Sequence, residues 1–145
     1  MILVTDIVNC LGNDVLVALD EKRSVIPVRV MADRQQGLPS LKYLNTEVSE
    51  VSLFDMPSLD KAFQGIDRLL ICNSNFLQDY RSAYTNLIRC AQESKVGHIM
   101  FVSSVSHSGI SSRMVCEDRE IENLIKSSGI PYTILRVNML MEYLP

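Results

Sequence analysis

Residues 1–15 read MILVTDIVNCLGNDV: an apolar run, a turn, and then the start of a helical pattern. In α/β proteins, a buried strand that leads through a short loop into a helix commonly binds phosphate groups, because the helix N-terminus attracts anions. Such loops usually hold three glycines, whereas this stretch holds only Gly12. Asp6 and Asn9 lie at the spacing of the other two glycines. The stretch therefore predicts a strand–loop–helix unit with an altered phosphate-binding loop.

The rest of the chain continues this alternation of apolar runs and helical patterns. Continuous apolar strands separated by helices predict a parallel sheet that is buried on both faces. Right-handed crossovers then give an α/β, doubly wound, mainly parallel, Rossmann-like sheet of about six strands with helices on both faces. Pro27 lacks a backbone donor, which suggests that the second strand lies at an edge or pairs irregularly. The expected strands are 2–5, 25–30, 47–51, 68–72, 98–102 and 132–136, and the expected helices are 12–20, 58–65 (with Ser58 as N-cap and Gly65 as C-terminal stop), 77–94 and about 113–128.

Composition limits the class of protein. The 145 residues, 47% hydrophobic and 21% charged, indicate one globular domain over residues 1–145. A net charge of −3 predicts no nucleic-acid partner, and no apolar run approaches the roughly 20 residues that span a membrane. The N-terminus lacks the features of a signal peptide, so a cytoplasmic location is expected. Four cysteines without CxxC spacing and only two histidines predict reduced thiols and no metal site.

Four stretches, in order, carry a family resemblance: VTDIVNCLGNDV (4–15), DMPSLDKAFQGIDRLLI (55–71), NLIRCAQESKVGHIMFVSS (86–104) and SGIPYTILRVNMLME (128–142). Together they resemble the NmrA-like family of atypical short-chain dehydrogenases/reductases. The resemblance implies a Rossmann fold that binds NAD or NADP. Members of that family include NAD(P)H-dependent reductases and non-catalytic regulators, and they commonly continue into a small substrate-binding lobe. We therefore expect a single cofactor-binding domain over residues 1–145 that lacks this C-terminal lobe.

The resemblance places the pyrophosphate loop at Thr5, Asp6, Asn9, Cys10, Leu11 and Gly12. Gly12 keeps the role of close helix–strand packing, and Asn9 tolerates left-handed backbone angles better than most residues. The carboxylate of Asp6 would repel a pyrophosphate 4 Å away by roughly 4 kcal/mol at an effective dielectric of about 20. Alternatively, Asp6 caps the first helix with its own carboxylate and takes the place of the anion.

The remaining cofactor contacts implied by the resemblance follow the second to fifth strands. Asp33 or Arg34 would select NAD or NADP, and the sequence leaves that choice open. Ser52 and Leu53 stand where the family contacts adenine. Asn73 and Ser74 offer polar groups near the nicotinamide ribose, with a solvated loop as the alternative. Ser103 and Ser104 could hydrogen-bond a ligand, with a turn or capping role as the alternative. The family's catalytic Tyr and Lys positions fall on Met114 and Asp118, so no catalytic residue is predicted.

Two functions follow from these observations. The first is an NAD(P)-binding protein related to NAD(P)H-dependent reductases, which transfer hydride to a small quinone or carbonyl, with weakened cofactor binding. The second is a non-catalytic regulator or interaction module that keeps the fold without the dinucleotide. In either case, the edge beyond the sixth strand predicts a homodimer.

Overall fold

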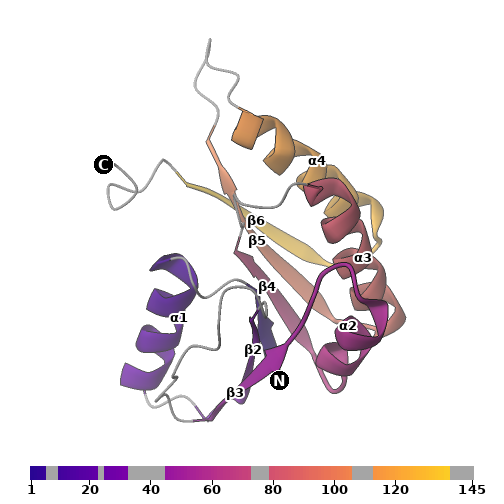
Figure 1. Cartoon of the computed structure of the whole chain (residues 1–145). Coiled ribbons are helices and arrows are strands. Elements are labelled where there is room, and N and C mark those ends of the chain that lie inside the picture. Colours follow the sequence, from indigo (N-terminus) through magenta and orange to yellow (C-terminus); the bar gives the residue numbers. More distant parts are fainter. Residues whose placement is uncertain (6–9, 23–24, 33–44, 73–78, 106–112, 138–145) are drawn as a thin grey trace.

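The computed structural model describes residues 1–5, 10–22, 25–32, 45–72, 79–105 and 113–137. These residues form a six-stranded parallel sheet in the order β3-β2-β1-β4-β5-β6 (Figure 1). The strands are β1 (Ile2–Val4), β2 (Val28–Ala32), β3 (Thr46–Glu50), β4 (Arg68–Cys72), β5 (His98–Ser104) and β6 (Tyr132–Val137). The helices are α1 (Cys10–Glu21), α2 (Met56–Phe63), α3 (Tyr80–Glu93) and α4 (Arg113–Ser127). The predicted doubly wound α/β fold is confirmed.

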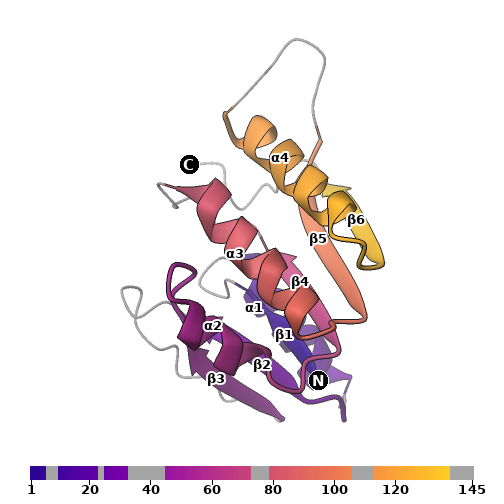
Figure 2. The same ribbon diagram turned by 90° about the vertical axis from the view of Figure 1, so that its right-hand side faces the viewer.

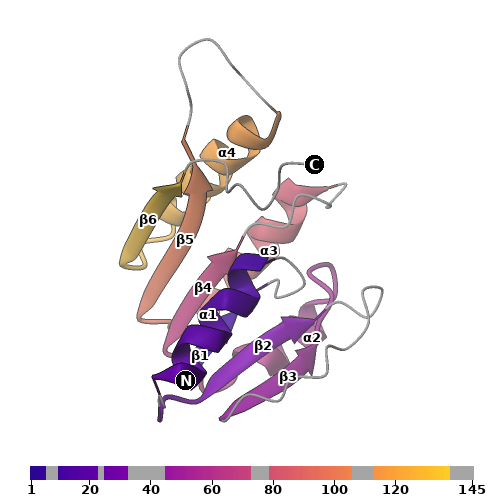
Figure 3. The same cartoon turned by 90° about the vertical axis from the view of Figure 1, so that its left-hand side faces the viewer.

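Helices cover the two faces of the sheet unequally. Figure 2 shows α2, α3 and α4 together in front of one face. Figure 3 shows the opposite face, on which α1 is the helix among the described residues. This division follows from the handedness of the crossovers. The connection from β1 to β2 runs one way across the sheet, whereas those from β3 to β4 and on to β6 run the other way. Right-handed crossovers therefore place their helices on opposite faces.

Alternate residues of the four central strands, β1, β2, β4 and β5, supply the two halves of the core. Leu3, Leu69 and Phe101 belong to a large cluster with residues of α2, α3 and α4, including Phe63 and Leu87. Their neighbours Val4, Val30 and Leu70 pack with Leu16 of α1 in a smaller cluster. A strand that buries both faces needs apolar residues at consecutive positions, which explains why β4 reads as the run RLLIC.

Pro27 predicted that the second strand lies at an edge or pairs irregularly, and the edge alternative is wrong. Strand β2 begins at Val28, one residue after the proline, and it pairs with β1 on one side and β3 on the other. Pro27 contributes its carbonyl, which accepts a hydrogen bond from the Ile2 amide at 3.0 Å. Because proline lacks only the donor, it can stand before an interior strand in this way.

The predicted start of the second helix is also wrong by two residues. Helix α2 begins at Met56 after the N-cap residue Asp55, and Pro57 occupies its first turn, where no amide partner is needed. Ser58 lies inside the helix, and its hydroxyl donates to the Asp55 carbonyl at 2.8 Å. Gly65 follows the helix end with φ of 75°, the left-handed conformation expected of a glycine stop.

Two properties of the same described ranges concern membranes and metal ions. None of the helices there combines the length and apolarity required to cross a membrane. Nor do the described His, Cys, Asp and Glu side chains form a group of three or more that could hold a metal ion.

Candidate functional site

The strand order reverses between β1 and β4, since the chain moves from β1 to β2 and β3 on one side and later returns to β4 on the other. In open parallel sheets, ligands bind outside the carboxyl ends of the strands at such a reversal. Helix α1 joins the parallel strands β1 and β2, so its N-terminus lies at this same edge (Figure 3). The positive end of its dipole therefore faces the ligand position.

Thr5 fastens the two strands together at the reversal point. Its side chain is buried, and its hydroxyl donates to the Cys72 carbonyl at 3.1 Å and accepts from the Cys72 amide at 3.0 Å. The Thr5 amide also donates to the Leu70 carbonyl at 3.0 Å. Thr5 thus extends the pairing of β1 and β4 by one step and sets the point from which the loop departs.

Several predicted site residues lie outside the described part of the chain: Asp6, Asn9, Asp33, Arg34, Asn73 and Ser74. Cys10 opens α1, and Leu11 and Gly12 follow in its first turn, with Gly12 buried. Their placement at the helix start agrees with the strand–loop–helix unit expected from residues 1–15. The charge effect expected of Asp6 remains a prediction.

Ser52 and Leu53 form a closed turn between β3 and α2. The Ser52 carbonyl accepts from the Asp55 amide at 3.0 Å, and its hydroxyl accepts from the Phe54 amide at 3.3 Å. The Leu53 side chain packs against the core, while its carbonyl accepts from Asn86 Nδ2 at 3.0 Å. The turn leaves Phe54 54% exposed at the carboxyl edge, an aromatic residue that sequence reasoning missed.

Ser103 and Ser104 are the last two residues of β5, which runs two residues beyond its predicted end. The Ser103 hydroxyl donates to Glu122 Oε1 at 2.8 Å, and Ser103 is buried. The Ser104 amide donates to Asp118 Oδ2 at 2.8 Å, and the Ser104 hydroxyl bonds the same oxygen. Both hydroxyls are therefore engaged by carboxylates of α4.

Glu122 is the centre of this group, with a side chain only 1% exposed. It accepts hydrogen bonds from Arg136 Nη2 at 2.7 Å and Lys126 Nζ at 3.3 Å, and it pairs with Arg119. Burial alone would raise the pKa of Glu122, but the hydrogen bonds from Arg136, Ser103 and Lys126 and the charge of Arg119 outweigh it and lower this pKa to about 2. Glu122 is therefore ionised at neutral pH.

Sequence reasoning assigned no role to Glu122, Arg119 or Arg136. A signal was present: charged residues at 118, 119, 122 and 126 recur with helical spacing beside the buried Ile121 and Ile125. Arg136 likewise is the one charged residue of its strand, YTILRV. We name the seven connected residues the Glu122 cluster: Ser103, Ser104, Asp118, Arg119, Glu122, Lys126 and Arg136.

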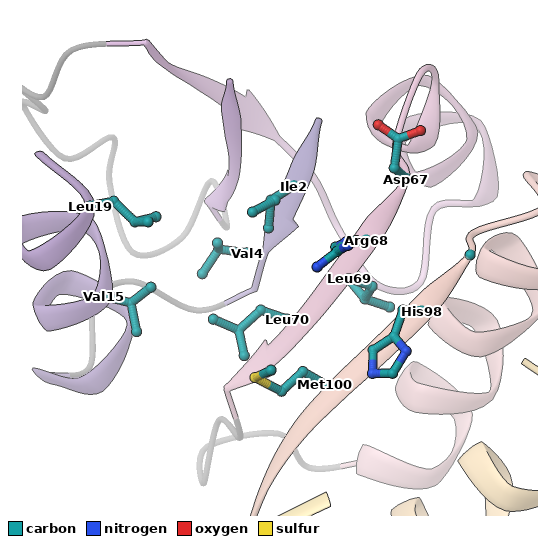
Figure 4. Close-up of a pocket in the computed structure, with 11 residues that line it drawn as sticks. Ile2, Val4, Val15, Leu19, Asp67, Arg68, Leu69, Leu70, His98 and Met100 are labelled. Atoms are coloured by element: carbon teal, nitrogen blue, oxygen red, sulfur yellow. The ribbon is translucent and has the colours of Figure 1, made fainter. Parts of the chain in front are cut away.

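A separate groove of about 730 Å³ lies on the α1 face of the sheet (Figure 4). Its apolar walls come from α1, β1, β4 and β5, while Arg68 and His98 begin β4 and β5. The groove therefore reaches the amino ends of β4 and β5. Its lining residues are Ile2, Val4, Val15, Leu19, Asp67, Arg68, Leu69, Leu70, Gly97, His98 and Met100.

The chain matches known proteins along nearly its whole length. A sequence model described as NAD(P)H-binding matches residues 11–143. The chain is 27% identical over 145 residues to the (4-alkanoyl-5-oxo-2,5-dihydrofuran-3-yl)methyl phosphate reductase of Streptomyces griseus, covering 97% of this chain and 48% of the relative. It is 24% identical over 136 residues to quinone oxidoreductase 2 of Escherichia coli, covering 94% of this chain and 48% of the relative. The chain thus spans about half the length of the curated relatives it matches.

Among solved structures, the fold resembles that of an NADPH-dependent quinone oxidoreductase from Escherichia coli crystallised with NADPH. The TM-score is 0.82 at 24% identity, over 99% of this chain and 50% of that one. At this identity, the likeness establishes the Rossmann-like fold.

Proposed function

This chain belongs to the NAD(P)H-binding family, and we propose that it forms the cofactor domain of an NAD(P)H-dependent reductase. The observation that carries the proposal is the reversal of strand order at Thr5, with the N-terminus of α1 facing the same edge. A helix N-terminus at such a reversal suits a pyrophosphate, because unpaired amides and the helix dipole both favour an anion.

The proposed contacts run along the carboxyl edge. The start of α1 would hold the pyrophosphate, and the turn after β3 would meet adenine, to which Phe54 offers an aromatic face. The ends of β4 and β5 would lie on the nicotinamide side. The proposed binding residues are Thr5, Asp6, Asn9, Cys10, Leu11, Gly12, Asp33, Arg34, Ser52, Leu53, Asn73, Ser74, Ser103 and Ser104.

When bound, the nicotinamide supplies the hydride that reduces a small quinone or carbonyl compound. The chain's own part is to bind and orient that ring. Thr5 fixes the strand ends beneath it, and Ser103 and Ser104 shape the β5 end. Within the family we place the protein in the NmrA-like branch, in the cytoplasm, with residues 1–145 forming one cofactor domain.

Titration of the purified chain with NADPH and with NADH tests the proposal. We expect saturable binding of at least one of them with a Kd below about 100 μM, which corresponds to more than roughly 5 kcal/mol of binding free energy. Nicotinamide fluorescence or calorimetry measures it. If neither nucleotide binds, the proposal fails, and a regulator or interaction module that keeps the fold alone becomes the better description.

Asp6→Asn is expected to tighten NADPH binding at least about tenfold at low salt, because it removes a negative charge near the proposed pyrophosphate position. Asp14→Asn is the matched control, since Asp14 is an exposed acidic residue one turn into α1. Equal affinities for the wild-type chain and Asp6→Asn would show that Asp6 acts as a helix cap and not as a repelling charge.

The proposed assembly is a homodimer formed through β6, which lies at one edge of the sheet. Leu135 on this strand is 45% exposed and Tyr132 is 44% exposed. Leu135→Lys should convert a dimer into a monomer by light scattering, because a buried lysine charge at the interface is costly. Val25→Lys is the control, since Val25 is 86% exposed before β2. A monomeric wild-type chain would contradict the assembly.

A further inference from the structure

We propose that the Glu122 cluster is a positioning device that holds the carboxyl ends of β5 and β6 in place for the nicotinamide side of the cofactor. This inference rests on the proposed function for its ligand. The part that concerns the strand ends, namely that side chains of α4 hold them in place, rests on the hydrogen-bond geometry alone.

The cluster lies on the last steps of the β5–β6 pairing. Ser103 is paired with Arg136 and Ser104 with Val137, and the Val105 amide donates to the Val137 carbonyl at 2.9 Å. These positions lie at the carboxyl edge of the sheet, where ligands bind in parallel sheets. The orientation of the main chain here therefore decides which groups the ends of β5 and β6 present at that edge.

Ser104 is held by side chains of α4 at both its polar backbone groups. Asp118 accepts from its amide, as well as from its hydroxyl, and Arg119 Nη2 donates to its carbonyl at 2.9 Å. Arg119 Nη1 donates to Ser103 Oγ at 3.1 Å and also bonds Glu122. One guanidinium thus joins two strand residues and a buried carboxylate, a geometry that depends on the planar fork of arginine.

On the other side, Arg136 of β6 donates through both Nε and Nη2 to Glu122, at 3.0 and 2.7 Å. Glu122 therefore links the ends of both strands through one carboxylate.

Attachment of α4 to the sheet does not require these charges. Ile121 and Ile125 on the same helix are fully buried in the core and provide the apolar contact. Buried ion pairs can often be replaced by apolar residues without loss of stability. We therefore assign these charges to orienting the strand ends and not to holding α4 on the sheet. Hydrogen bonds set the angle and register of the strand ends, which apolar packing leaves loosely defined.

Two substitutions of Arg119 distinguish its role in positioning the strand ends from its role in balancing the charge of Glu122. Arg119→Met removes both, whereas Arg119→Lys keeps a positive charge beside Glu122 and loses the fork. We expect both variants to raise the Kd for NADPH at least about tenfold, the scale seen when supporting residues around a site are lost. Amide hydrogen exchange of Ser104 and Val105 should accelerate in both, while the amides of β1 and β4 stay protected.

Arg113→Met is the matched control, because Arg113 bonds Glu117 on the same helix and is 77% exposed. It should leave both the Kd and the exchange rates unchanged. Arg119→Lys with wild-type affinity and wild-type exchange at Ser104 and Val105 would overturn the inference and reduce the cluster to charge neutralisation. If the wild-type chain binds no NADPH, the proposed function fails, and unchanged exchange in Arg119→Lys still decides against positioning.

Discussion

Glu122→Gln is expected to lower the free energy of unfolding by about 3 kcal/mol at pH 7. The native environment lowers the pKa of this carboxyl from 4.5 to about 2, and a difference of that size between folded and unfolded chains corresponds to about 3 kcal/mol in favour of the ionised native state. Glutamine mimics the protonated acid and leaves Arg119, Lys126 and Arg136 without their shared anion. Urea unfolding followed by circular dichroism measures the difference.

The same substitution predicts a change in pH dependence. Because the folded pKa lies below the unfolded one, the contribution of Glu122 is complete above pH 4.5 and is lost as the pH falls toward 2. The gap between the wild-type chain and Glu122→Gln should therefore shrink between pH 5 and pH 2. Glu117→Gln, which breaks a pair with an exposed arginine, should cost less than about 1 kcal/mol. A gap that stays constant with pH would show that ionisation of Glu122 is not the cause.

Thr5→Val is expected to lower the free energy of unfolding by about 2–3 kcal/mol, because a buried hydroxyl that both donates and accepts is replaced by a methyl group of similar shape. The amide and carbonyl of Cys72 lose their bonds to that hydroxyl. The substitution also loosens the join between β1 and β4 at the proposed cofactor site, so the Kd for NADPH should rise with it.

Thr5→Ser is the control for this prediction. Serine keeps both hydrogen bonds and loses one methyl group, so it should cost about 1 kcal/mol and leave the Kd close to that of the wild-type chain. Chemical denaturation and nucleotide titration of both variants make the comparison. Equal losses for valine and serine would assign the effect to packing and not to the hydrogen bonds.

Local pattern was sufficient for most of the fold. Apolar runs such as RLLIC predict strands, and helical spacing over residues 77–94 predicts a helix, because the type of such an element depends on nearby residues. The right-handed preference of the crossovers then determines how the strands are arranged in the sheet. The roles expected of Pro27 and Ser58 were wrong because the elements begin elsewhere: the strand begins at Val28, and Asp55 occupies the N-cap position without a side-chain capping hydrogen bond. Boundaries shift by a residue or two without altering the topology.

The candidate site, too, was predicted in part from local pattern and decided in part by tertiary contacts. The sequence by itself determined the sheet, the helix that begins after the first strand, and the edge at which a ligand is expected, because all three depend on periodicity and connection rules. Only the tertiary structure decided that Thr5 bonds Cys72, 67 residues away, and that Ser103 and Arg136 converge on Glu122. Hydroxyl, carboxylate and guanidinium groups each accept many partners, so which ones meet is set by strand register and helix placement. No local pattern encodes that choice.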